Sequence, residues 1–98
     1  MADLRFEWGE KKNILNKKKH GISFEEAQTV FADENALLIH DPDHSVGENR
    51  FVLLGLSLKL RVLVVCHCYQ KSDTFIRIIS ARKATRLEQE QYWDRWQK

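Results

Sequence analysis

Three largely apolar runs separated by short polar segments occupy most of the C-terminal half of the chain, and such runs predict β-strands. The predicted strands cover residues 50–56, 60–69 and 74–82. Only residues 57–59 and 70–73 separate them, which is too short for a crossover between parallel strands. We therefore expect an antiparallel meander.

Two shorter strands are predicted nearer the N-terminus. Residues 4–8 alternate between apolar and charged side chains, which directs Leu4, Phe6 and Trp8 toward a core. Residues 36–39 form a second short apolar run that enters a proline-containing loop.

The intervening segments have helical signals. Residues 10–19 predict a lysine-rich helix with Ile14 and Leu15 as its apolar anchors, ended by Gly21. The segment Ser23–Glu26 matches a capping box and predicts the start of a second helix.

A second capping box, Thr85–Glu88, predicts a last helix that reaches residue 97, with Tyr92, Trp93 and Trp96 on one face. The pattern as a whole predicts an α+β fold: a mainly antiparallel sheet with two N-terminal helices and one C-terminal helix. At 98 residues and 43% hydrophobic content, residues 1–98 suit a single domain.

The composition and the N-terminal residues indicate where in the cell the protein is expected. The longest apolar stretch, residues 51–69, is interrupted by Lys59 and Arg61, so it predicts two strands and a turn, and no membrane span. The N-terminus lacks the pattern of a signal peptide, and two cysteines make no disulfide framework. We expect a cytoplasmic protein.

Charge is unevenly distributed although the net charge is only +2. Residues 11–19 hold five lysines and no acid, and residues 77–86 hold four cations and no acid. Residues 33–48 carry five acids and no Lys or Arg. Two basic blocks are typical of a face for polyanions, or of ordinary solvated surface.

The strand at residues 74–82 carries charge in an apolar run. A period of two puts Arg77 on one face with Ile79 and Ala81, and Ser80 and Arg82 on the other, unless the strand ends, bulges or twists near Ser80. A cation among apolar neighbours needs a carboxylate or a phosphate, so Arg77 is either paired structurally or binds an anion.

The strand at residues 60–69 places Arg61, His67 and Tyr69 on one face. If the hairpin puts Arg77 on that face too, the four side chains form a phosphate-binding patch. A one-residue slip in register would scatter it.

These residue types suit RNA cleavage without a metal, in which a base removes the 2′-hydroxyl proton, cations stabilise the transition state and an acid protonates the leaving oxygen. His20 or His67 could transfer protons, and Lys19, Arg77 and Arg82 could hold phosphate.

A metal site is the alternative offered by His40, Asp41, Asp43 and His44, which crowd into five positions. Aspartates also form turns beside proline, and no second ligand pair follows at a standard spacing, so we expect no metal and no other cofactor. The thiols in Cys66-His-Cys68 are expected to pack as small hydrophobes.

The order of several motifs resembles that of the BrnT family of bacterial toxins. These motifs are Phe6-Glu-Trp8, Lys19-His-Gly-Ile-Ser-Phe-Glu-Glu-Ala27, Val30-Phe-Ala-Asp33, Asp41-Pro-Asp-His44, Gly47-Glu48, Arg50-Phe51 and Ile76-Arg-Ile-Ile-Ser-Ala-Arg-Lys-Ala-Thr85. The resemblance implies a compact RelE-like fold and a metal-independent ribonuclease that inhibits translation. It also implies a BrnA-like ribbon-helix-helix antitoxin, a hetero-oligomeric complex, and contact with operator DNA only through that partner.

By this resemblance the expected site or motif residues are Trp8, Lys19, His20, Arg50, Arg77, Ser80 and Arg82. We assign Arg77, His20, His67 and Arg61 to catalysis, and Lys19, Arg50, Ser80, Arg82 and Trp8 to RNA binding. His67 and Arg61 come from their own chemistry and not from the family pattern. The competing hypothesis is a binding module whose basic sheet face docks a partner without chemistry.

Overall fold

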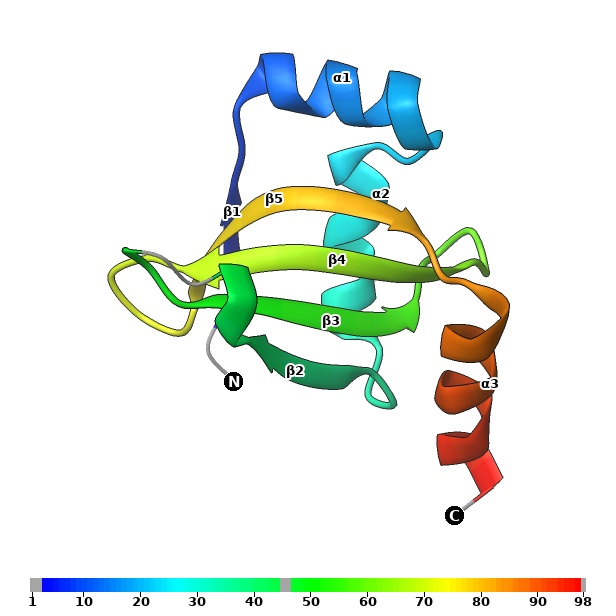
Figure 1. Ribbon diagram of the computed structural model, residues 1–98. Coiled ribbons are helices and arrows are strands. Elements are labelled where there is room, and N and C mark those ends of the chain that lie inside the picture. The colour runs from blue at the N-terminus through cyan, green and yellow to red at the C-terminus, as the bar shows by residue number, and fades with distance from the viewer. Residues whose placement is uncertain (1–2, 45–46, 98) are drawn as a thin grey trace.

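A five-stranded sheet organises the molecule, with strand order β1-β5-β4-β3-β2 (Figure 1). The computed structural model describes residues 3–44 and 47–97. The strands are β1 (Arg5–Glu7), β2 (Leu37–Asp41), β3 (Arg50–Leu56), β4 (Val62–Tyr69) and β5 (Phe75–Lys83). Strands β2 to β5 pair antiparallel in chain order and β1 pairs parallel with β5, so the predicted meander is confirmed.

The helices are α1 (Glu10–His20), α2 (Phe24–Thr29) and α3 (Arg86–Asp94), with short 3-10 turns at η1 (Val30–Ala32), η2 (Pro42–His44) and η3 (Arg95–Gln97). Both predicted capping serine and threonine side chains accept a bond from a backbone N–H, Ser23 from Glu26 and Thr85 from Glu88. Figure 1 shows α2 crossing behind the strands and α3 beside one end of the sheet. The predicted α+β fold is confirmed.

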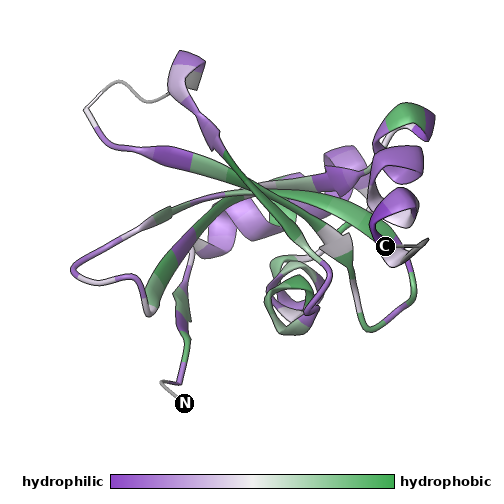
Figure 2. Cartoon of the chain, turned by 90° about the horizontal axis from the view of Figure 1, so that it is seen from below, coloured by the Kyte–Doolittle hydropathy of each residue, from purple (hydrophilic) through white to green (hydrophobic). Residues whose placement is uncertain are grey.

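One face of the sheet, here called the inner face, packs against α2 and η1 and carries the main core. Its buried members include Leu63, Val65 and Ile78 from the strands with Phe24 and Val30 from the helical segment. Figure 2 shows hydrophobic residues concentrated along the crossing strands. Phe6 and Trp8 pack at the margin of this core as predicted, whereas Leu4 is 41% exposed, because β1 begins only after it.

The opposite, outer face is covered only at one end. There Tyr92 of α3 is fully buried and packs with Leu54, Val62 and Val64. In the part of the chain that the structure describes, neither α1 nor α2 covers the rest of this face (Figure 1).

Helix α1 lies along the edge of β5 beyond the end of β1, and it docks through polar side chains. Its two buried residues are Asn13 and Asn16, while Ile14 and Leu15 are 60% and 63% exposed. The prediction that Ile14 and Leu15 anchor this helix was therefore wrong. The asparagines are buried because their side chains form hydrogen bonds to backbone groups that no strand pairs with.

A β-bulge in β5 decides which side chains share a face. Cys66 lies opposite Ser80, but His67 lies opposite Ile78, so Ile79 is an extra residue. The bulge shifts the alternation by one residue, which sends Ala81 into the inner core and turns Ser80 and Arg82 to the outer face with Arg77. The simple alternation predicted for this strand is corrected accordingly.

Candidate functional site

A line of polar side chains crosses the outer face on all five strands. The register sets Glu7, Arg77, Cys68, Arg50 and Asp41 opposite one another in that order. Directly paired residues project on the same side of a sheet, with strands about 4.8 Å apart. Two arginines thus flank the buried Cys68 in the middle of this face.

Ser80 and Arg82 extend this line along β5. Ser80 pairs with Cys66 and Arg82 with Val64, so both continue the outer face from Arg77. Cys66 is half-buried, and burial raises the pKa of its thiol, so at neutral pH it is a small neutral neighbour of the Ser80 hydroxyl.

Each of the three arginines faces a carboxylate. Arg77 Nη1 lies 3.6 Å from Glu7 Oε1, and Arg50 Nε lies 3.7 Å from Glu48 Oε1. These distances are longer than those of a charge-assisted hydrogen bond. The loose pair of Arg77 stabilises little and leaves a guanidinium group that can exchange partners.

Arg82 is held more tightly. Its Nη1 and Nη2 donate to the two carboxylate oxygens of Glu88 at 2.8 and 2.9 Å. The same Glu88 accepts from the backbone N–H of Thr85 at 2.7 Å, and bonding to Arg82 lowers the pKa of Glu88 to about 2. Arg82 therefore ties β5 to the start of α3 as well as facing the site.

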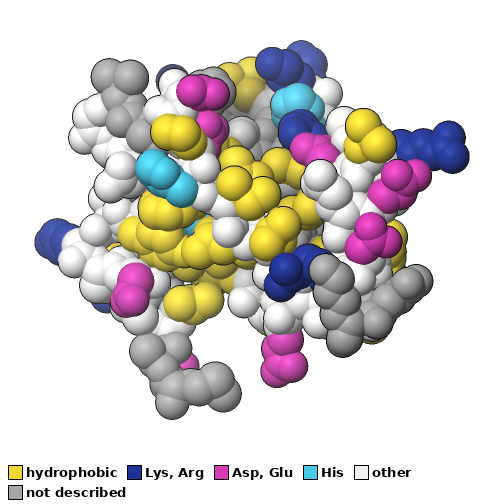
Figure 3. Space-filling view, turned by 60° about the horizontal axis from the view of Figure 1, so that its bottom comes forward, with side chains coloured by type: hydrophobic (Ala, Val, Ile, Leu, Met, Phe, Trp, Pro, Cys, Tyr) yellow, Lys and Arg dark blue, Asp and Glu magenta, His cyan; other side chains and the backbone are white. Residues whose placement is uncertain are grey.

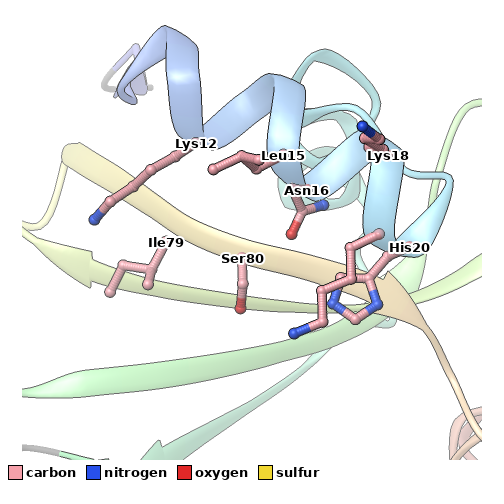
Figure 4. A pocket seen from close by; sticks show the side chains of 8 residues that line it. Lys12, Leu15, Asn16, Lys18, His20, Ile79 and Ser80 are labelled. Atoms are coloured by element: carbon pink, nitrogen blue, oxygen red, sulfur yellow. The ribbon is translucent and has the colours of Figure 1, made fainter.

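A groove of about 520 Å³ opens beside this line, between α1 and β5 (Figure 4). Eight described residues line it: Lys12, Leu15, Asn16, Lys18, Lys19, His20, Ile79 and Ser80. Three residues expected in the site, Lys19, His20 and Ser80, meet here. Ser80 lines this groove and also lies between Arg77 and Arg82 on β5. The groove and the arginine line, meaning Arg50, Arg77 and Arg82, therefore form one continuous candidate site.

Arg61 lies elsewhere. Its Nε donates to Glu26 Oε2 at 3.0 Å, and its Nη2 also pairs with Glu26, whose side chain is 3% exposed. Burial alone would raise the pKa of Glu26, but bonds from Arg61 and Ser57 lower it overall. The expected patch of Arg61 with Arg77 is wrong, because Arg61 neutralises a buried acid on α2.

His67 is also separated from Arg77. It projects from the inner face opposite Ile78, is fully buried, and lies among the rings of Phe31, Phe51 and Tyr69. Burial lowers its pKa, and its Nε2 has no hydrogen-bond partner among the described residues. The expected convergence of His67 and Arg77 fails because strand register sets them on opposite faces.

Trp8 is half-buried and packs edge-on against Phe24, with ring centroids 6.0 Å apart. This contact belongs to the inner core, so Trp8 does not join the outer-face residues. In the loop after β2, residues 45–46 lie outside the described residues, and the described ones include no group of three acids, histidines or cysteines able to hold a metal.

Sequence reasoning missed several residues of the site. Lys12, Leu15 and Asn16 were missed, although with the expected Lys19 they follow the spacing i, i+3, i+4 and i+7, which puts all four on one face of a helix. This helical spacing is present in the sequence, but Leu15 was assigned with Ile14 to the core. Glu7 and Cys68 could not be found, since only pairing across strands brings them beside Arg77 and Arg50.

No described helix is long and apolar enough to cross a membrane. A search of curated proteins found no match. Among solved structures, the chain resembles the 1.1 Å crystal structure of the Brucella abortus ribonuclease toxin BrnT, with a TM-score of 0.63 and 20% identity over 85% of this chain and 99% of that one. At this identity the likeness supports the fold alone.

A family model described as "Ribonuclease toxin, BrnT, of type II toxin-antitoxin system" matches residues 8–88. The match runs from Trp8 through β5 to Glu88, and so includes Arg50, Arg77, Arg82, the bulge and the groove. The chain belongs to the BrnT family of ribonuclease toxins from type II toxin–antitoxin systems.

Proposed function

We propose that this protein cleaves RNA without a metal at the outer face of its sheet and thereby inhibits translation. The observation that carries the proposal is the bulge in β5, which sets Arg77, Ser80 and Arg82 on one face, beside Lys19 and His20 of α1. This arrangement offers phosphate-binding cations next to a proton-transferring group.

The chemistry needs no group from outside the chain. The 2′-oxygen of RNA attacks the adjacent phosphorus, the bond to the 5′-oxygen breaks, and a 2′,3′-cyclic phosphate and a 5′-hydroxyl result. Arg77 stabilises charge on the phosphate oxygens, because guanidinium groups match their geometry. His20 takes part in the proton transfer from the 2′-hydroxyl to the 5′-oxygen. Lys19, Arg50, Ser80 and Arg82 position the RNA strand.

The carboxylate partners of the arginines support this assignment. An RNA phosphate can take the place of Glu7 beside Arg77, whose side chain is 41% exposed, because the existing contact of 3.6 Å is weak. Arg61 and His67 have no such opening, so we leave them out of the catalytic group.

Membership of a type II system implies a protein antitoxin. We propose a BrnA-like ribbon-helix-helix partner that forms a hetero-oligomer with this chain in the cytoplasm and alone contacts operator DNA. Exposed apolar side chains on α3 and η3, namely Leu87, Trp93 and Trp96, are compatible with a protein partner.

The double variant Arg77→Ala, Arg82→Ala tests the reaction. We expect purified wild-type protein to cleave single-stranded RNA in the presence of EDTA, and the double variant to cleave at least about 100-fold more slowly, as for loss of transition-state charge stabilisation. Product analysis should find cyclic phosphate ends.

Arg86→Ala is the matched control, since the Arg86 side chain is 94% exposed on α3. Because Arg82 also anchors α3, Arg77→Ala alone is measured beside the double variant, with circular dichroism to verify folding. A folded double variant that cleaves like wild type would contradict the proposal. Wild-type protein that cleaves nothing, but whose arginines set the affinity for the antitoxin, would support the binding module instead.

A further inference from the structure

The groove between α1 and β5 has a composition that phosphate binding alone does not explain. Leu15 contributes a 63% exposed side chain to it, and the half-buried bulged residue Ile79 contributes an aliphatic side chain from the strand. Figure 4 shows both side chains bordering the same hollow, with Lys12 at one end and His20 at the other. Aliphatic surface left open to solvent in a groove gains free energy when an apolar surface covers it.

The charges around the groove select what that surface belongs to. Lys12, Lys18 and Lys19 line it, and none of the eight described lining residues is acidic. Three ammonium groups beside an apolar floor complement a ligand that is flat and apolar in one part and anionic in another. A nucleotide has this composition, since each base is linked to a phosphate.

We propose that this groove holds one nucleotide of single-stranded RNA, with its base against Leu15 and Ile79 and its phosphate among the lysines. The inference rests on the proposed ribonuclease function and adds a substrate subsite to it. The groove lies directly beside Ser80, so a nucleotide bound there would lie next to the phosphate held by Arg77 and Arg82.

The polar groups of the groove indicate that the base is held without being read. The Asn16 amide already donates to the carbonyls of Ile22 and Ala81, both at 2.8 Å, and accepts from Ala81 N–H at 3.1 Å. With the Asn16 amide occupied, we expect the base to be held mainly by apolar contact, so the subsite tolerates any base.

Leu15→Ser tests the subsite, and Ile14→Ser is its matched control. Ile14 is on the same helix, is equally apolar and is 60% exposed, but it lines a different hollow. The probes are a 2′-O-methyl RNA octamer, which lacks the attacking hydroxyl and so is not cleaved, and the same octamer with abasic sites. Affinities are measured by fluorescence anisotropy.

We expect wild-type protein and Ile14→Ser to bind the base-containing octamer about five- to tenfold more tightly than the abasic one, as for one partly buried apolar contact. In Leu15→Ser this ratio should fall to about twofold or less. Lys19→Gln should weaken binding of both octamers equally, because its contact is to phosphate.

An unchanged ratio in Leu15→Ser would overturn the subsite. If unmodified RNA is still cleaved in that case, the ribonuclease function stands without the subsite. If wild-type protein neither binds nor cleaves any RNA, both proposals fail together. Loss of affinity for the antitoxin in Leu15→Ser, with RNA binding unchanged, would reassign the groove to the protein partner and overturn the nucleotide.

Discussion

Residues of the same type have different roles here because their partners differ in burial. Arg61 pairs with Glu26, whose side chain is only 3% exposed, so removing the arginine would leave a buried carboxylate. Arg77 lies 3.6 Å from Glu7, whose side chain is 40% exposed. A competing anion can displace this carboxylate at little cost in free energy. The contrast explains why one arginine belongs to the core and the other to the site.

His67 gives the clearest pH dependence at this scale. Burial lowers its pKa in the folded chain, whereas in the unfolded chain it titrates near the usual value for histidine. The unfolded state therefore binds more protons below about pH 6.5, so folding is stabilised at higher pH and loses stability as the pH falls.

We expect the free energy of unfolding of wild type to decrease between pH 7.5 and pH 5 more steeply than that of His67→Leu, by up to about 1.4 kcal/mol per pH unit. Urea unfolding at half-unit pH steps measures both curves. The other titratable groups are shared, so the difference isolates His67. Parallel curves would show that His67 takes up its proton equally in both states.

At the scale of elements, helix α1 is unusual because asparagines attach it to the sheet. Asn13 accepts from Phe24 N–H at 2.8 Å and donates to Glu25, while Asn16 bonds both backbone groups of Ala81. Ala81 lies two residues after the bulged Ile79, on the stretch of β5 that β1 does not reach. Asn16 thus acts like a neighbouring strand and holds the bulge that orients Ser80 and Arg82.

Asn16→Leu should lower the free energy of unfolding by about 2–3 kcal/mol, because the Ala81 N–H and two carbonyls lose their partners. Hydrogen exchange at the Ala81 amide should accelerate, and RNA cleavage should fall even where the variant is folded. The reverse exchange on the exposed side of the helix, Ile14→Asn, should change stability by less than about 0.5 kcal/mol. Slow exchange at Ala81 in folded Asn16→Leu would show that the bulge holds itself.

At the scale of the whole molecule, the lysine-lined groove and the exposed tryptophans lie in different parts of the fold. Figure 3 shows hydrophobic side chains gathered over the middle of one view, with most of the charged side chains around them. The groove lies between α1 and β5, while Trp93 of α3 and Trp96 of η3 are 42% and 51% exposed. The molecule can therefore present a polyanion-binding face and a second, apolar surface.

Expression in cells tests the function of the complete molecule. We expect the chain alone to arrest growth and to cleave cellular RNA, and the cognate antitoxin expressed with it to restore growth. The Arg77→Ala, Arg82→Ala variant should leave growth unaffected at equal protein level. Arrest of equal strength by a folded double variant would show that toxicity arises elsewhere than at the outer face.

Sequence by itself determined the elements of this protein and the order of its motifs. Alternation and capping boxes are local properties, so the meander, the three helices and the α+β class followed from them, and the motif order indicated the BrnT family. Arg77, Ser80 and Arg82 were predicted as site residues from the same local pattern and motif order.

Only the tertiary structure decided which of these residues meet. One extra residue, Ile79, reverses the face of every side chain after it, and a bulge depends on pairing with β4 and not on local propensity. Arg61 was removed from the site by a carboxylate 35 positions away, and His67 by the register of its strand. Faces and partners are set by contacts between distant segments, which an alternation pattern does not contain.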